Sequence, residues 1–399
     1  MCFNKMIERM IVIMMKTRSL LRVAGLVFVL GVGVGLMSCS SGSTPNPTIP
    51  KFLVAVDGSG VGTNVNVFPI DKTTGVLGAA VAGSPFDLGV TDGMTLAVHP
   101  NGRFVYAADG VDGGIHAWKV NETTGVPTEI AAKVINESGS FYEPSNVADS
   151  PTHVITITPK GKFLYSANND TTVGAYKINS NGSLAHLADL DLTVAACATG
   201  AITANDSFAW VTDTCPGNAG PWHVFTLKIG TDGTLTSVGS IALTGVDAWL
   251  WSIQVNPTAS FLYVGDEGGG AQLFSFSIAA NGSLTQLGPP LVEKSSSDVR
   301  DIAHSPDGKF FYATDDDTVI HAFSVDAITG AITELSASPY AGGAGQVVAD
   351  VTGKFVYMGD QEGTGQILGF TRDPVTGALT LIGNTTTAKG KALAIGIVR

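Results

Sequence analysis

The sequence has 399 residues, of which 44% are hydrophobic, only 14% are charged and 49 are glycines. Low charge combined with abundant glycine is typical of a well-buried, turn-rich all-β protein and argues against a helical or a disordered chain. The net charge is −12, and no basic run offsets it, which argues against nucleic-acid binding because a negative protein repels a polyanion.

Residues 1–38 have the pattern of an export signal. Basic residues precede the apolar stretch 23–37, which is shorter than the ~20 residues that span a bilayer. The four residues that end at Cys39 (LMSC) resemble the bacterial lipobox, in which the cysteine is lipidated and becomes the new N-terminus. The alternative is an ordinary signal peptide followed by a chance cysteine.

Residues 39–50 follow as a flexible tether rich in Ser, Gly and Pro, a composition with nothing to pack. Acyl chains on Cys39 would hold the protein at a membrane without a spanning helix. We therefore expect an exported protein that is lipid-anchored in the cell envelope, and Ser40 beside the lipidated residue favours the outer membrane. Without the signal, the net charge would be about −16.

Residues 51–399 repeat one pattern seven times. A phenylalanine opens a short strand that ends in Asp or Asn five residues later, and the seven starts lie 45 to 59 residues apart. This spacing is typical of four-stranded β-propeller blades. The seven segments are 52–57, 104–109, 163–168, 208–213, 261–266, 310–315 and 355–360.

A glycine in a TG, NG or DG step follows each of these phenylalanines after 19 to 25 residues and predicts a hairpin. Each repeat is thus predicted to run as inner strand, turn, Phe strand, Asp-rich loop, third strand, hairpin and outer strand. The first repeat lacks its inner strand, and the apolar segment 392–398 (ALAIGIV) ends the chain without a partner. Pairing the two would remove both open edges. We predict an all-β fold, a seven-bladed β-propeller of four-stranded blades closed by this C-terminal strand.

Cys197 and Cys215 lie symmetrically about Asp206, in the expected turn between the first two strands of one blade. Residues equidistant from a hairpin turn face each other, within reach of a disulfide. Because export leads to an oxidising compartment, we predict a Cys197–Cys215 disulfide. Two free buried thiols are the alternative.

The segment 299–335 (VRDIAHSPDGKFFYATDDDTVIHAFSVDAITGAITEL) and the Gly-Ser-Pro-Phe stretch 83–86 resemble the seven-bladed β-propeller lactonase family, the 6-phosphogluconolactonase-like proteins. The resemblance covers essentially all of 51–399 and implies the propeller fold and hydrolysis of a lactone. Members of this family commonly carry Asn and Arg after the second strand of a blade. This sequence has Asp315-Asp316 or Asp266-Glu267 there, and no catalytic residue is carried over from the family.

The residues that begin the inner strands are expected at the mouth of the central channel, where ligands usually bind. Lactone hydrolysis needs a base that activates water and a donor that stabilises the oxyanion. His153 as the base and Arg300 as the clamp for an anion or oxyanion are the candidate catalytic residues. The alternative is that both side chains satisfy strand-end carbonyls and neighbouring acids.

Four further residues are candidates for substrate binding. Trp249 and Trp251 are placed to stack on a sugar ring, while Asp149 lies four residues before His153 and Asp301 directly after Arg300. We predict no metal site and no cofactor. The Asp repeated in each blade recurs at a radius where neighbouring blades lie roughly 10 Å apart, too far to converge on an ion, and is expected to cap its own loop.

Two functions remain open at this point. The first is hydrolysis of a sugar or sugar-acid lactone in the cell envelope. The second is a non-catalytic propeller that binds a glycan, a peptide or an envelope protein. Both predict a monomer whose partners are a small carbohydrate-type ligand or an envelope component, with membrane contact through the lipid anchor only and no nucleic acid.

Overall fold

The structure is a computed structural model that describes residues 52–57, 64–90, 93–110, 113–130, 132–135, 154–168, 170–192, 198–214, 221–246, 249–267, 270–292, 298–360, 364–387 and 391–399. The chain divides into two units, Met1–Asn46 and Pro47–Arg399, and every described residue belongs to the second. The predicted export signal, Cys39 and the tether lie outside the described residues. Within the described part, no helix has the length and hydrophobicity that crossing a bilayer requires.

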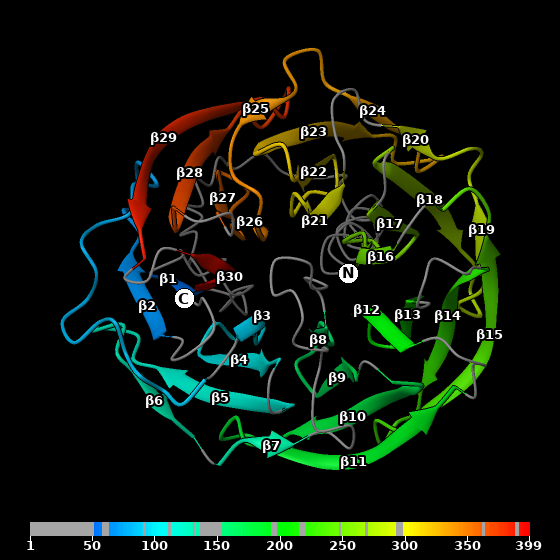
Figure 1. Ribbon diagram of the computed structural model, residues 1–399, viewed down its shortest axis with the longest axis horizontal. Coiled ribbons are helices and arrows are strands. Elements are labelled where there is room, and N and C mark those ends of the chain that lie inside the picture. The colour runs from blue at the N-terminus through cyan, green and yellow to red at the C-terminus, as the bar shows by residue number, and fades with distance from the viewer. Residues whose placement is uncertain are drawn as a thin grey trace, which may run out of the picture. The chain divides into compact units, whose positions relative to one another are not determined.

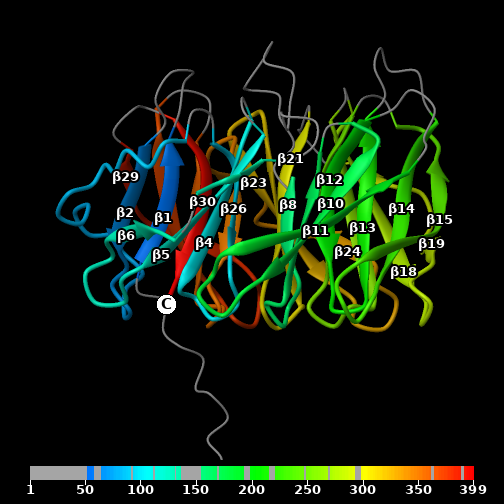
Figure 2. The ribbon, with the colours of Figure 1, turned by 90° about the horizontal axis from the view of Figure 1, so that it is seen from below.

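Seven antiparallel sheets stand as blades around a central axis (Figure 1), and the inner strand of each blade runs along that axis (Figure 2). The predicted all-β, seven-bladed propeller is confirmed. Blade 1 contains β30 (Ala392–Val398), β1 (Phe52–Asp57) and β2 (Asn64–Pro69), and blade 2 contains β3 (Gly93–Val98), β4 (Phe104–Asp109), β5 (Gly114–Val120), β6 (Pro127–Glu129) and β7 (Val134–Ile135). Blade 3 contains β8 (Ile155–Ile157), β9 (Phe163–Ala167), β10 (Thr172–Ile178) and β11 (Leu184–Asp191), and blade 4 contains β12 (Ala198–Ala204), β13 (Phe208–Thr214), β14 (Trp222–Ile229) and β15 (Leu235–Leu243).

Blades 5 to 7 continue the same order from the axis outwards. Blade 5 contains β16 (Trp249–Val255), β17 (Phe261–Glu267), β18 (Gln272–Ile278), β19 (Leu284–Gln286) and β20 (Leu291–Val292). Blade 6 contains β21 (Val299–His304), β22 (Phe310–Asp315), β23 (Val319–Val325), β24 (Ile332–Glu334) and β25 (Tyr340–Ala341). Blade 7 contains β26 (Val347–Ala349), β27 (Phe355–Gly359), β28 (Gln366–Arg372) and β29 (Leu379–Thr386). In blade 1 the fourth position consists of single bridges, Val65 to Phe86 and Ile70 to Leu77.

The ring closes in blade 1, where the two ends of the propeller sequence pair. β30 lies antiparallel to β1, from Val398 opposite Phe52 to Ala392 opposite Asp57. The C-terminal segment thereby supplies the inner strand that the first repeat lacks, as the sequence predicts. β1 is thereby covered on the side where an open edge would recruit other chains, and β30 becomes the inner strand of its blade.

The hydrophobic core of the described residues lies between the blades. It forms seven clusters, each shared by two neighbouring blades, and the last joins blade 7 to blade 1 through Phe355 and Tyr357 packed with Leu53 and Phe68. A second strand such as β4 or β22 is buried along its whole length, because a blade is covered on both faces. This explains why these strands read as continuous apolar runs rather than as alternating ones.

The repeated Phe and Gly of the sequence meet across the blade boundary. The ring of each Phe lies against the hairpin glycine of the next blade, as Phe310 does with Gly377 and Phe355 with Gly75. In five blades a Tyr two residues after the Phe donates from its hydroxyl to the carbonyl of the same glycine, as the Tyr312 hydroxyl does to the Gly377 oxygen at 2.9 Å, whereas blade 1 has Val54 at this place. In blade 4 the Trp210 indole nitrogen makes this bond. The sequence repeat is therefore a blade-to-blade contact.

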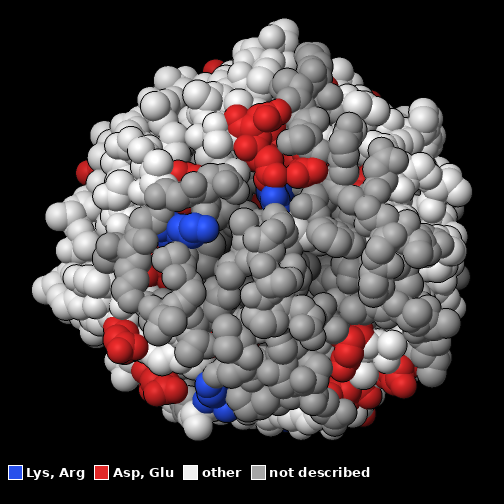
Figure 3. Space-filling model, in the orientation of Figure 1, with Lys and Arg blue, Asp and Glu red and all other residues white. Residues whose placement is uncertain are grey.

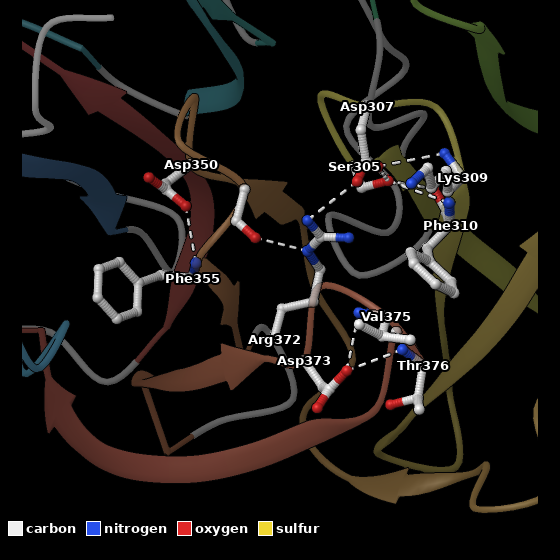
Figure 4. A network of polar contacts seen from close by, with 12 residues as sticks. Ser305, Asp307, Lys309, Phe310, Asp350, Phe355, Arg372, Asp373, Val375 and Thr376 are labelled. Atoms are coloured by element: carbon white, nitrogen blue, oxygen red, sulfur yellow. Dashed lines mark hydrogen bonds and ion pairs between the residues drawn. The ribbon is translucent and has the colours of Figure 1, made fainter.

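Blades 6 and 7 are also joined by a buried arginine at the end of the propeller opposite the inner-strand starts (Figure 4). Arg372 donates from Nε to the Gly353 carbonyl at 2.5 Å and from Nη2 to Asp307 at 3.2 Å, and its guanidinium lies 5.4 Å from the centre of the Phe310 ring. The corresponding position in β5 and β10 holds Val120 and Ile178. Arg372 thus adds a polar bridge where other blades use an aliphatic contact.

Candidate functional site

The candidate site lies at the mouth, which we define as the end of the central channel where the inner strands begin and the second strands end. Here the ladder between inner and second strand contains a β-bulge in the blades of β3, β16 and β21. The extra residue is Met94, Trp251 and Arg300, respectively. A bulge bends its strand and re-aims the side chain of the extra residue. Trp251 and Arg300 are thus removed from the regular alternation of their strands.

The ladders of β30 with β1 and of β12 with β13 shift at the corresponding place. The bulge is therefore a shared feature of the mouth, while the residue that occupies it differs from blade to blade. His153 has the corresponding place before β8 in the sequence and, like Asp149, lies outside the described residues. Their roles stay predictions.

Arg300 and Trp251 come from neighbouring blades and lie against each other. The guanidinium carbon of Arg300 is 4.9 Å from the centre of the Trp251 ring, and each residue is only 2% exposed. A cation over an indole face is favourable, and more so when it is desolvated. The structure thus brings two of the predicted site residues together. Trp249 begins β16, and its side chain is not among those described.

Arg300 is held by carboxylates on its other side. Its Nε and Nη2 donate to the two carboxylate oxygens of Asp316, the latter at 2.7 Å, and Nη2 lies 4.0 Å from Asp298. Burial by itself raises the pKa of Asp316, but hydrogen bonds with Arg300 and Asp298 and the arginine charge leave this pKa below its ordinary value. Asp316 is therefore ionised at neutral pH and balances the charge of Arg300 in a two-point ion pair.

In Figure 3 this acidic character is visible on the face that carries the mouth, where red groups border a blue one near the middle of the view. Asp301 belongs to the same strand as Arg300 but has a different role. It is fully buried, and its carboxylate accepts the Val347 N–H at 2.7 Å. Because Val347 lies on the inner strand of blade 7, Asp301 provides a hydrogen-bond acceptor for a backbone N–H of the next blade.

In blades 1, 4 and 6 the Asp near the end of the second strand caps the segment that follows. Asp57 accepts the Asn64 N–H at 2.8 Å, Asp213 the His223 N–H at 2.6 Å and Asp315 the Val319 N–H at 3.1 Å. These carboxylates bind donors of their own blade, as expected for capping residues. Among the described residues, no cluster of His, Cys, Asp and Glu is arranged to hold a metal ion.

Cys197 and Cys215 lie outside the described residues, so the disulfide stays a prediction. The neighbouring ladder is more complex than a symmetric hairpin about Asp206. Ala204 pairs with Ala209, which centres the turn between residues 206 and 207, and the bulge then brings Ala198 opposite Thr214. The turn is displaced by half a residue from Asp206, and the extra residue of the bulge shifts the pairing back, so that Ala198 and Thr214 are again symmetric about Asp206.

His304 is a buried histidine between blades 5 and 6, away from the mouth. Its ring packs on Tyr263 and Phe311 at 5.1 and 5.2 Å between centres, and within the described structure neither ring nitrogen has a hydrogen-bond partner. Burial lowers the pKa of His304 from 6.5 to about 3. The fold therefore requires the neutral imidazole.

This histidine should make the propeller sensitive to acid. The unfolded chain binds a proton below pH 6.5 and the folded one only near pH 3, so stability should fall as the pH drops through this range. His304→Ile introduces the residue found at the corresponding position, Ile157. We expect the wild type to lose about 2 to 3 kcal/mol more than this variant between pH 7.5 and 4.5, measured by urea unfolding. Equal losses would contradict this assignment.

The chain matches the family model described as lactonase, 7-bladed beta-propeller, over residues 48–349 and again over 298–395. A search among curated proteins found no match. Solved structures of similar fold include a candidate 6-phosphogluconolactonase from Bacteroides fragilis, with 17% identity, a TM-score of 0.71 and coverage of 89% of this chain and 99% of that one.

The periplasmic gluconolactonase of Pseudomonas aeruginosa is similar in fold too, with 17% identity, a TM-score of 0.68 and coverage of 88% and 99% of the two chains. At these identities the structural similarity supports only the fold, and the assignment to a family rests on the match to the family model. The match spans nearly all of the seven blades. The chain belongs to the lactonase family of seven-bladed β-propellers.

Proposed function

We propose that the protein hydrolyses a sugar or sugar-acid lactone at the mouth of the propeller and that it does so in the cell envelope, anchored by a lipid on Cys39. The observation that carries the proposal is the Arg300–Trp251 pair, which places a hydrogen-bond donor and an aromatic face together at two adjacent bulges. Family membership favours lactone chemistry, and the pair differs from the residues that every blade repeats.

The proposed reaction is addition of water to the lactone carbonyl. His153 takes a proton from the water, and the hydroxide adds to the carbonyl carbon. Arg300 donates to the oxyanion that forms from an N–H group other than the two that bind Asp316, while Trp251 holds the guanidinium from its other side. The bond from the carbonyl carbon to the ring oxygen then breaks, His153 returns the proton to that oxygen, and a hydroxy acid leaves.

The test is acid release from glucono-1,5-lactone and related lactones, followed at constant pH with the purified full-length chain. We expect a rate that saturates with substrate and exceeds spontaneous hydrolysis by several orders of magnitude, as is usual for enzymes. A rate equal to the spontaneous one over the whole panel would contradict the proposal and favour the non-catalytic binding protein. Labelling with a radioactive fatty acid, compared between the wild type and Cys39→Ala, tests the anchor independently.

A further inference from the structure

We propose that the mouth selects uncharged sugar lactones and rejects lactones that carry a phosphate, and that Asp316 is the residue that sets this preference. This inference rests on the proposed function, because it names the class of substrate for the same site. It also distinguishes this chain from a simple reading of its family, in which an arginine at the mouth would be taken as a phosphate clamp.

The first observation is that the charge of Arg300 is already paired with a carboxylate. An arginine binds phosphate through two parallel N–H donors, and here Nε and Nη2 of Arg300 bind the two oxygens of Asp316 in this geometry. The arginine side chain is 3% exposed and that of Asp316 26% exposed. The carboxylate therefore stands between solvent and the buried guanidinium. A phosphate that approached from solvent would have to displace it.

The second observation is that further acidic side chains lie beside this pair. Asp298, whose side chain is 19% exposed, lies 4.0 Å from Nη2 of Arg300, and Asp317 next to Asp316 is exposed. Lys391, just before the inner strand of blade 1, is two blades away from Arg300. A phosphate dianion at Arg300 would therefore meet the Asp316 carboxylate at contact distance, well within the Debye length of about 8 Å at physiological salt.

An uncharged lactone avoids this repulsion and still uses the site. Its hydroxyl groups donate to carboxylates, which accept hydrogen bonds only. The acidic groups that exclude a phosphate thus serve as acceptors for a neutral sugar. Like-charge contacts of this kind set specificity more than they set affinity.

The experiment compares kcat/KM for glucono-1,5-lactone and for 6-phosphogluconolactone in the full-length chain, with spontaneous hydrolysis subtracted. We expect a preference for the uncharged lactone of about 100-fold or more. Asp316→Asn keeps the size of the side chain and removes its charge, and should narrow this preference at least about tenfold by improving hydrolysis of the phosphorylated lactone. Thermal unfolding of each variant monitors the fold.

Asp317→Asn is the matched control, because it removes the same charge from an exposed neighbour. This variant should change the preference by less than about threefold, since exposed charges are screened. A wild type that prefers the phosphorylated lactone, or equal effects of the two variants, would overturn the inference while leaving lactone hydrolysis standing. If the wild type hydrolyses neither lactone, the proposed function itself fails and the inference fails with it.

Discussion

A chain that ends at Lys391 is expected to be recovered as insoluble aggregate. The truncation removes β30, which pairs with β1 along all six residues of that strand. It also removes Ala394 and Val398 from the core between blades 1 and 2, and Ile395 from the core between blades 7 and 1. Both faces of the gap become apolar, and β1 becomes an unprotected edge that recruits other chains. The measurement is the soluble fraction of the protein after expression, followed by the far-ultraviolet circular dichroism spectrum of any soluble material.

The control returns the same strand at a different point of the sequence. Residues 392–398 followed by Pro-Asn-Gly would be inserted between Pro50 and Lys51 of the truncated chain. Val398 lies opposite Phe52, as His99 lies opposite Phe104 across the Pro100-Asn101-Gly102 turn, so this turn fits the register. We expect a soluble monomer. If this permuted chain aggregated like the truncated one, closure by β30 would not explain the loss.

The second large effect is expected at Gly377. Its φ is +74°, where an L side chain is strained, and an added Cβ would overlap the ring of Phe310. The backbone conformation costs about 1 to 2 kcal/mol, and overpacking a closed core typically adds about 1 to 3 kcal/mol. Gly377→Ala should therefore lower the free energy of unfolding by about 3 kcal/mol, measured by urea unfolding at neutral pH.

Gly89→Ala separates the two contributions. Gly89 has the same φ of +74°, but no heavy atom lies within 4 Å of an added Cβ. This variant should lose only the backbone part, about 1 to 2 kcal/mol. Equal losses at Gly89 and Gly377 would mean that the contact with Phe310 contributes nothing, and the account of the blade-to-blade contact would be wrong.

The architecture was predictable from the sequence because each blade needs the same few residues. The hairpin glycine must adopt positive φ, and the Phe before it in the chain must fill the next interface. The missing inner strand of the first repeat and the unpaired strand at 392–398 then implied closure. These signals are local or periodic, so they survive in a single sequence. The pairing of each Phe with the glycine of the following blade was not predicted, because periodicity alone does not say which repeats touch.

The site was predictable only in part. Counting back from the turn proline located Trp251 and Arg300, and the structure places them against each other. The bulges that select these two positions were not predicted, because a bulge depends on the pairing of two strands and leaves no periodic mark. The ion pair of Arg300 with Asp316 was missed for a related reason. It joins a residue of β21 to the turn residue that follows β22, and the register of these two strands shifts at the bulge. Asp301, predicted to bind substrate, instead meets the inner strand of blade 7.

The central claim is that activity lies at the mouth, where the blades differ, and the most direct test compares two buried arginines at opposite ends of the propeller. We would measure kcat for hydrolysis of glucono-1,5-lactone in the wild type, in Arg300→Lys and in Arg372→Lys. Arg372 is buried, stacks on Phe310 and pairs with Asp307, as Arg300 stacks on Trp251 and pairs with Asp316.

We expect Arg300→Lys to lose about 100-fold or more in kcat and Arg372→Lys to retain the wild-type kcat although its thermal midpoint falls. Wild-type kcat in Arg300→Lys, or an equal loss in both variants, would contradict the claim that activity lies at the mouth.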